Sequence, residues 1–344
     1  LASVIIAGVV FKRFDYNYAL RMLGVVGGAI LYYIVIAVVL WLGLETTDLK
    51  LISALIVAAF LALPHLKGKY AASHVKRGGG KLELKNIYKT FNPGSINEKR
   101  ALNGINLTLE DGDFVTIIGG NGAGKSTMLN AIAGVWPVDS GSVIIDGEDI
   151  TKLPEHKRAK YLGRVFQDPM NGTAADMEIE ENLAVAKRRG QTRTLRWGIT
   201  KKEREEYVEL LKPLDLGLET RLRAKVGLLS GRQRQALTLL MATLKKPKLL
   251  LLDEHTAALD PKTAAKVLEL SDKIIAEHNL TALMVTHNMK DAIVHGNRLI
   301  MMWDGKIILD IKGEEKKNLT VDDLLHQFTV ASGKEFANDR ALLG

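Results

Sequence analysis

The stretch Gly119-Gly-Asn-Gly-Ala-Gly-Lys-Ser-Thr127 decides the fold class. It follows an apolar run, Phe114 to Ile118, and it precedes residues 128–133, which the pattern predicts to be helical. A glycine-rich loop between a strand and a helix can wrap a phosphate, because glycines let the backbone N–H groups point inward. The helix N-terminus adds partial positive charge there. The alternative, a plain glycine turn, is disfavoured by the complete GxxxxGK[ST] pattern.

Two side chains of this phosphate loop have predicted roles. Lys125 can reach the outer phosphates of a nucleotide, and the Ser126 hydroxyl can ligate Mg²⁺. A second motif, Leu249-Leu-Leu-Leu-Asp-Glu254, predicts a strand that is buried on both faces and ends in two carboxylates. Asp253 would hold Mg²⁺, usually through water, and Glu254 would polarise the water that attacks the γ-phosphate. An acidic pair that caps the next helix is the alternative.

Composition narrows the class of protein. The 344 residues suffice for one large domain or two ordinary ones, and 47% of them are apolar. The net charge of +8 (47 basic against 39 acidic residues) fits a solvated surface and the flanks of membrane segments. A nucleic-acid partner is disfavoured because no basic stripe is interleaved with aromatic residues. Cysteine is absent, which excludes disulfides and thiolate metal sites and fits a reducing compartment.

The first 80 residues have the composition of membrane segments. Residues 22–44 carry no charge and are long enough to span a bilayer, whereas the run at 51–63 has 13 residues and could be tilted or re-entrant. We predict helices at about residues 1–11, 22–44 and 49–66. A buried hairpin of a soluble protein is disfavoured by the unbroken run. Because the chain begins at Leu1, we expect a fragment or a processed product.

The charges between these runs predict an orientation. The loops are basic, then acidic, then basic, which places the end of the membrane segment on the cytoplasmic side. Gly78-Gly-Gly80 marks a flexible junction. We therefore predict a membrane segment at 1–77, a soluble domain at 78–315 and a helical tail at 316–344.

Periodicity predicts an α/β fold for the soluble domain, with an antiparallel β subdomain, a parallel core and a helical insertion at about 175–245. Asn92 to Arg100 is predicted to be a turn, and residues 318–328 an amphipathic helix. Strands are expected at 81–91, 102–109, 114–118, 143–145, 161–166, 249–252, 282–285, 299–303 and 306–309.

Over residues 81–315 the sequence resembles ABC-transporter ATPases of the P-loop NTPase class. Gln167 resembles the Q-loop glutamine, Leu229-Ser-Gly-Arg-Gln233 resembles the LSGGQ signature, and Asp260 lies in a segment similar to the D-loop. His287 resembles the switch histidine. Phe91 stands where the family places an aromatic ring on adenine, and Tyr88 is the neighbouring option or a core residue.

The resemblance implies ATP and Mg²⁺ as cofactors and two ATPase domains paired head to tail, with Ser230 and Gly231 acting on the partner's nucleotide. It implies catalytic roles for Lys125, Gln167, Glu254 and His287, and metal contacts from Ser126, Gln167 and Asp253. The implied nucleotide contacts are Phe91, Gly119, Asn121, Gly122, Gly124, Lys125, Ser126, Thr127, Ser230, Gly231, Gln233 and Asp260.

Two residues depart from the family pattern. Arg232 replaces the second signature glycine, and it either hinders closure of the ATP sandwich or points away from it. His255 replaces a proline, and we expect no mechanistic consequence. We interpret Met284, Met289, Met301 and Met302 as core residues. Lys187, Arg188, Arg189, Arg193 and Arg196 are interpreted as a solvated face, or as a contact with the membrane partner.

We therefore expect an ATP-hydrolysing component of an ABC importer at the cytoplasmic membrane, energising uptake of an amino acid or related solute. The N-terminal part resembles the last helices of an importer permease of the branched-chain amino acid and sugar type. Permease helices, the bilayer and an extracytoplasmic solute-binding protein are the expected partners, and nucleic acid is not. The alternatives are an ATP-binding module whose hydrolysis is impaired by Arg232, and an ATPase that acts on nucleic acid or ribosomes.

Overall fold

The computed structural model describes residue 30, residues 81–191 and residues 198–332. The chain divides into two units at Lys76/Arg77, and all described residues except Ile30 belong to the second unit. The predicted membrane helices and the glycine junction lie outside the described residues. Within the described ranges, no helix has the length and apolarity needed to cross a bilayer. The proposed domain boundaries therefore stay predictions.

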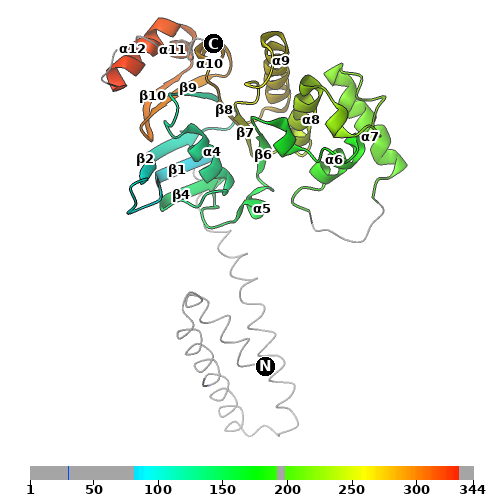
Figure 1. The fold of residues 1–344 in the computed structure, drawn as a ribbon, viewed down its shortest axis with the longest axis horizontal. Coiled ribbons are helices and arrows are strands. Elements are labelled where there is room, and N and C mark those ends of the chain that lie inside the picture. The colour runs from blue at the N-terminus through cyan, green and yellow to red at the C-terminus, as the bar shows by residue number, and fades with distance from the viewer. Residues whose placement is uncertain (1–29, 31–80, 192–197, 333–344) are drawn as a thin grey trace. The chain divides into compact units, whose positions relative to one another are not determined.

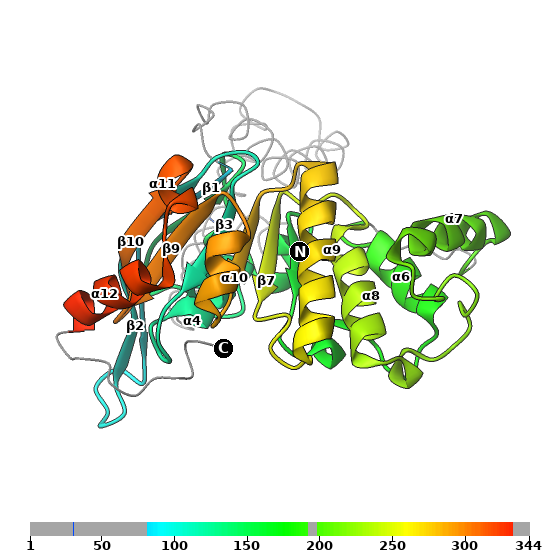
Figure 2. The same cartoon turned by 90° about the horizontal axis from the view of Figure 1, so that it is seen from above.

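A six-stranded sheet forms the centre of the described unit (Figures 1 and 2). Its strand order is β10-β9-β3-β8-β7-β6, and all neighbours are parallel except β9 and β10. The parallel core and the hairpin at Asp304-Gly305 are thus confirmed. The strands are β3 (Phe114–Ile118), β6 (Leu162–Val165), β7 (Leu249–Asp253), β8 (Ala282–Val285), β9 (Arg298–Trp303) and β10 (Lys306–Lys312).

A separate four-stranded sheet has the order β2-β1-β4-β5 and is antiparallel, as predicted. Its strands are β1 (Leu82–Phe91), β2 (Lys99–Leu109), β4 (Ser140–Ile145) and β5 (Glu148–Asp149). The predicted turn up to Arg100 was too long, because Lys99 already pairs with Phe91 in the β1–β2 ladder.

Helices cover both faces of the six-stranded sheet. Leu249 and Leu251 of β7 pack with residues of α4, whereas Leu250 and Leu252 pack with α9 on the other face. All four leucines are fully buried, which confirms the strand with two buried faces. Among the described residues, the helices outside the helical insertion are α4 (Lys125–Ala133), α5 (Glu155–Arg158), α9 (Pro261–His278), α10 (Met289–Val294), α11 (Glu314–Lys317) and α12 (Val321–Ser332).

Three helix predictions need correction. The helix after the phosphate loop begins at Lys125, because Gly124 takes a left-handed conformation as its N-cap. The terminal helix is α12, and it begins and ends later than predicted. Helix α9 was not predicted, although Asp260 at its N-cap, Pro261 and a left-handed Asn279 at its C-cap are start and stop signals.

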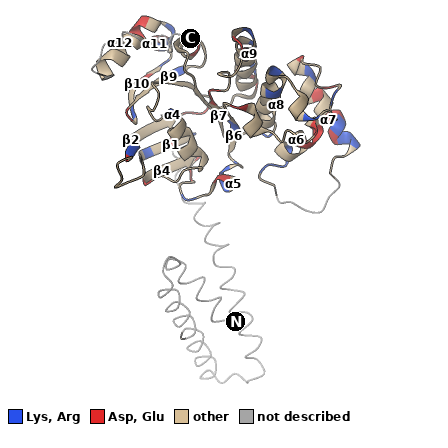
Figure 3. Ribbon diagram, viewed as in Figure 1, with Lys and Arg blue, Asp and Glu red and all other residues tan. Residues whose placement is uncertain are grey.

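The helical insertion has its own core, between α6 (Ile179–Lys187), α7 (Lys201–Leu211) and α8 (Gly231–Thr243). Short 3₁₀ turns accompany these helices, η2 (Pro169–Gly172) before α6, and η3 (Lys212–Leu214) and η4 (Val226–Leu228) after α7. Mixed blue and red segments mark charged residues of both signs around α7 (Figure 3).

The predicted solvated basic face was wrong for Arg189, whereas the side chains of Lys187 and Arg188 are 32% and 41% exposed. Lys187 and Arg188 pair with Glu206 and Glu203 of α7, at 2.5 and 3.1 Å. Arg189 donates to the carbonyls of Ala242 and Lys245 at the end of α8. The three cations therefore join helices to one another. Arg193 and Arg196 lie outside the described residues. The four methionines predicted to be core residues are buried, which confirms that prediction.

Candidate nucleotide-binding site

The phosphate loop joins the end of β3 to the start of α4. Gly119 and Gly124 have φ angles of 149° and 102°, which L side chains rarely adopt. A Cβ atom on Gly119 would lie 2.2 Å from the Met302 carbonyl oxygen, and one on Gly124 would lie 2.5 Å from that of Ala101. Both positions therefore require glycine, and the loop stays close against its neighbours at the N-terminus of α4.

The Lys125 side chain lies against the inner side of the phosphate loop. Its side chain is buried, and its Nζ donates to the carbonyl oxygens of Gly119 and Gly120 at 2.7 and 3.2 Å. Burial lowers the pKa of Lys125, and the charges of Glu254 and Asp253 act in the opposite direction. A phosphate oxygen in the loop could replace these carbonyls as the acceptor.

Side-chain oxygen atoms from three parts of the chain lie near the rim of the loop, where they could ligate a metal ion. The Ser126 hydroxyl on α4 lies 3.5 Å from Oδ1 of Asp253 at the end of β7. Gln167, two residues after the end of β6, lines the same pocket as Ser126. Burial raises the pKa of Asp253, and the nearby Arg164 counteracts this rise. A hydroxyl, a carboxylate and an amide form a hard-oxygen set that fits Mg²⁺ shared with substrate phosphates.

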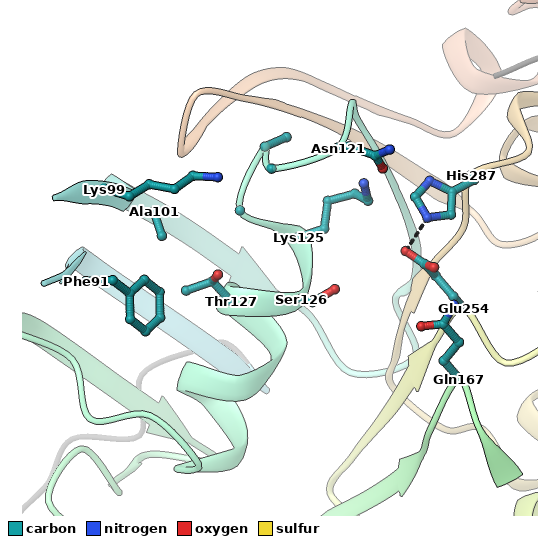
Figure 4. Close-up of a pocket in the computed structure, with 13 residues that line it drawn as sticks. Phe91, Lys99, Ala101, Asn121, Lys125, Ser126, Thr127, Gln167, Glu254 and His287 are labelled. Carbon is teal, nitrogen blue, oxygen red and sulfur yellow. Dashed lines mark ion pairs between the residues drawn. The ribbon is translucent and has the colours of Figure 1, made fainter. Parts of the chain in front are cut away.

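Glu254 and His287 lie within hydrogen-bond distance of each other. His287 Nε2 lies 2.6 Å from Glu254 Oε1 (Figure 4). Glu254 has a positive φ of 45°, and its N–H donates to the Val285 carbonyl of β8 at 3.1 Å. A non-glycine residue in this conformation costs free energy, and such residues concentrate at functional sites. The backbone of Glu254 is therefore held where its carboxylate faces the loop.

A pocket of about 350 Å³ connects these groups with the antiparallel sheet. Phe91 lies at its far side in Figure 4, edge-on to Trp136 with ring centroids 4.9 Å apart. Tyr88 is 43% exposed, so its interpretation as a core residue was wrong, and it is not among the residues that line the pocket. The pocket is lined by Phe91, Lys99, Ala101, Asn121, Gly122, Ala123, Gly124, Lys125, Ser126, Thr127, Gln167, Glu254 and His287.

One cation of this pocket, Lys99, was not predicted from the sequence. Lys99 on β2 extends toward the phosphate loop, and a Cβ atom on Gly122 would lie 2.8 Å from its Nζ (Figure 4). No local sequence pattern marks Lys99, because its position follows from the β1–β2 register, which places it opposite Phe91. Two ammonium groups thus face the loop, Lys99 from outside and Lys125 from within.

The predicted signature residues lie apart from this pocket. Ser230 is the N-cap of α8 and forms a capping box with Gln233, in which the Ser230 hydroxyl accepts from the Gln233 N–H and the Ser230 N–H donates to Gln233 Oε1. Ser230 and Gly231 are exposed, so the N-terminus of α8 is open. Asp260 caps α9 by accepting from the Thr263 N–H at 3.1 Å. Hydrogen bonding with the Thr263 side chain, and then with its backbone, lowers the pKa of the Asp260 carboxyl. Neither segment lines the pocket of its own chain.

His255 is part of the core. Its side chain is 2% exposed, and its Nε2 lies 3.0 Å from the Ser271 hydroxyl of α9. Burial lowers its pKa to about 4, so the imidazole is neutral at physiological pH. His255 therefore packs the segment after Glu254 against α9.

Comparisons with known proteins agree with this geometry. The family model described as "ABC transporter" matches residues 102–257. The tyrosine transport ATP-binding protein of Clostridioides difficile is 47% identical over 251 residues, which cover 73% of this chain and 99% of that protein. The spermidine/putrescine import ATP-binding protein PotA of Haemophilus influenzae is 34% identical over 67% of this chain and 57% of its own length.

Solved structures show the same fold. A dimeric ATP-binding cassette in a post-hydrolysis state, bound to ADP and Pi, superposes with a TM-score of 0.58 at 32% identity, covering 67% of this chain and 98% of that chain. An ATP-binding cassette in its ADP conformation gives a TM-score of 0.61 at 28% identity, covering 73% and 98%. The chain therefore belongs to the ABC transporter ATPase family.

Proposed function

We propose that this chain binds Mg²⁺-ATP in the pocket around the phosphate loop and hydrolyses it with Glu254 as the general base. The observation that carries the proposal is the convergence of Lys125, Ser126, Gln167, Glu254 and His287 on one pocket. Phe91 would pack against the adenine at the far side, and the loop N–H groups would bind the β- and γ-phosphates. Asn121, Gly122 and Thr127 complete the proposed phosphate contacts.

The residues would divide the chemical step among them. Ser126, Asp253 and Gln167 would hold Mg²⁺, which neutralises charge on the phosphates when it is bound. The Glu254 carboxylate would accept a proton from the attacking water. His287 lies within hydrogen-bond distance of Glu254, so it can orient that carboxylate and contact the γ-phosphate. Lys125 would stabilise the charge that develops on the outer phosphate oxygens.

ATPase domains of this family dimerise and work with transmembrane partners, and we propose the head-to-tail arrangement for this chain. The open N-terminus of α8 supports it, because Ser230 and Gly231 are exposed and do not line their own chain's pocket. They would bind the γ-phosphate held by the partner's phosphate loop. Gln233 and Asp260 would hold the two segments in place through their capping bonds.

Arg232 need not obstruct this interface. It lines a groove between α8 and α9 together with Ala236, one turn further along α8, and with Lys266 of α9. Its side chain therefore lies on the face of α8 that is turned toward α9. This position favours the alternative in which Arg232 points away from the partner's nucleotide.

We expect Arg232→Gly to change steady-state ATP turnover by less than about twofold, because a surface substitution away from the reacting groups has a small effect. The measurement is phosphate release by the purified chain at saturating Mg²⁺-ATP. Gly231→Arg is the matched comparison, since it places the same bulk at the exposed first residue of α8, and it should reduce turnover strongly. A large gain in turnover for Arg232→Gly would restore the hypothesis of impaired hydrolysis.

We propose an amino acid, with tyrosine as the first candidate, as the solute whose uptake this ATPase energises. Similarity over nearly the full length of the tyrosine transport ATP-binding protein supports this choice. The unbroken apolar run at residues 22–44 supports a fused piece of permease that anchors the ATPase at the cytoplasmic side of the membrane. A solute-binding protein outside that membrane is the further partner we propose.

The test compares uptake of two radiolabelled solutes by cells that carry either the natural chain or its Glu254→Gln variant. We expect the variant to abolish tyrosine uptake by this system and to leave spermidine uptake unchanged. Loss of spermidine uptake alone would overturn the choice of solute. Unchanged uptake of both, in cells without another copy of the system, would overturn the proposed role in transport.

A further inference from the structure

Arg164 is a largely buried arginine beside the proposed metal ligand Asp253. In the β6–β7 ladder Arg164 is paired with Leu251, which packs against α4. Asp253 follows Leu251 by two residues, so all three side chains lie on the sheet face covered by α4. The side chains of Arg164 and Asp253 are each 14% exposed.

The guanidinium of Arg164 is fixed from three directions. Nη2 donates to Oδ1 of Asn130 on α4 at 2.7 Å and lies 3.7 Å from Oδ2 of Asp253. The guanidinium carbon lies 4.5 Å from the centroid of the Phe166 ring. Arginine presents a rigid planar group, so a stacked ring and a hydrogen bond together leave it little freedom to rotate.

The two carboxylate oxygens of Asp253 consequently face different partners. Oδ2 faces Arg164, whereas Oδ1 lies 3.5 Å from the Ser126 hydroxyl at the phosphate loop. Asn130 lies one turn after Ser126 on α4, so Arg164 contacts the helix that carries Ser126 as well as the carboxylate. Gln167, the third proposed metal ligand, follows Arg164 by three residues on the same chain segment.

We propose that Arg164 is a positioning residue that holds the Asp253 carboxylate and α4 in the geometry required to bind Mg²⁺ with the nucleotide. This inference rests on the proposed Mg²⁺ site of Ser126, Gln167 and Asp253. Partners that orient metal ligands from behind commonly contribute tenfold to a hundredfold in metal affinity. In the described structure Arg164 makes no contact with the phosphate loop. We therefore expect its replacement to weaken Mg²⁺ binding and to leave the affinity for nucleotide without Mg²⁺ nearly unchanged.

The experiment measures binding of a fluorescent ATP analogue by the full chain, in EDTA and during a Mg²⁺ titration. Arg164→Met keeps an unbranched side chain in the buried space and removes the charge and the hydrogen bond. We expect its affinity for the analogue in EDTA to stay within about twofold of the natural chain, and its Mg²⁺ midpoint to rise about tenfold. Arg164→Lys keeps the positive charge but lacks the planar guanidinium, so its Mg²⁺ midpoint should lie between those of the natural chain and of Arg164→Met.

Arg158→Ala is the matched control, because Arg158 is also buried and also binds α4, at the carbonyls of Ala131 and Ile132. It should lower the melting temperature and leave the Mg²⁺ midpoint unchanged. Asn130→Ala gives a second test if Arg164→Met fails to fold, and it should raise the midpoint by a smaller factor.

The outcomes separate this inference from the function on which it rests. If the natural chain responds to Mg²⁺ and the Arg164 and Asn130 variants respond at the same midpoint, the positioning role is wrong and the metal site stands. Equal loss of affinity in EDTA and in Mg²⁺ would also overturn it, because that pattern describes general damage to the pocket. A natural chain whose nucleotide binding ignores Mg²⁺ would overturn the proposed metal site itself.

Discussion

Replacing Glu254 with glutamine should reduce steady-state ATP turnover by about 10²–10⁴-fold, the usual contribution of a positioned general base. The amide keeps the size of the side chain and can still hydrogen-bond to His287, which lies 2.6 Å from Oε1 in the natural chain. It cannot accept a proton from water. The loop glycines, Lys125 and Ser126 are unchanged, so ATP should still bind, and the bound dimer should persist because the step that reopens it is blocked.

Turnover is measured as phosphate release, and the dimer by light scattering in the presence of Mg²⁺-ATP. Glu277→Gln is the matched control, because Glu277 is more than half exposed on α9 and its carboxylate pairs with Lys273 at the surface, at 3.9 Å. It should leave both quantities unchanged. If Glu254→Gln retained a tenth or more of the natural turnover, Glu254 could not be the general base.

Much of the site could be predicted because its chemistry needs neighbouring residues in a fixed order. The loop glycines, Lys125 and Ser126 lie in one short stretch, and their spacing is set by the backbone that must surround a phosphate. Asp253 and Glu254 follow a strand whose four leucines are visible in the sequence and are fully buried in the structure. Gln167 and His287 likewise follow apolar strands, and parallel strands bring such ends to one edge of a sheet.

Other features depend on contacts between segments that are far apart in the chain, and the sequence alone does not show which residues of these segments meet. Lys99 reaches the loop only because the β1–β2 register places it opposite Phe91. Arg164 is ordinary in sequence, and its role follows from the register of β6 against β7 and from Asn130 on α4. Arg189 was predicted to face solvent, yet it binds the carbonyl end of α8, and no local pattern reveals that partner.

The second large effect is expected from Lys125→Ala, which should weaken ATP binding by roughly tenfold to a hundredfold. Lys125 already donates to the carbonyls of Gly119 and Gly120, so its ammonium lies where the outer phosphates would enter the loop. Charge-assisted hydrogen bonds contribute about 1.5–3 kcal/mol, and about 1.4 kcal/mol corresponds to a tenfold change in affinity. Equilibrium binding of radiolabelled ATP by the purified chain measures the loss.

Lys99→Ala and Lys273→Ala are the comparisons that separate a specific effect of Lys125 on ATP binding from a general effect of losing a positive charge. Lys99 faces the loop from outside and is exposed, so its removal should weaken ATP binding by a smaller factor than removal of Lys125. Lys273 lies on α9 away from the pocket, and its removal should have no effect. The expected loss of ATP affinity is largest for Lys125, smaller for Lys99 and absent for Lys273. This order follows from how completely each ammonium group is desolvated at the loop, because the attraction between an ammonium and a phosphate grows as water is excluded. If Lys125→Ala bound ATP as tightly as the natural chain, the phosphates would not rest in this loop, and the proposed function would be wrong.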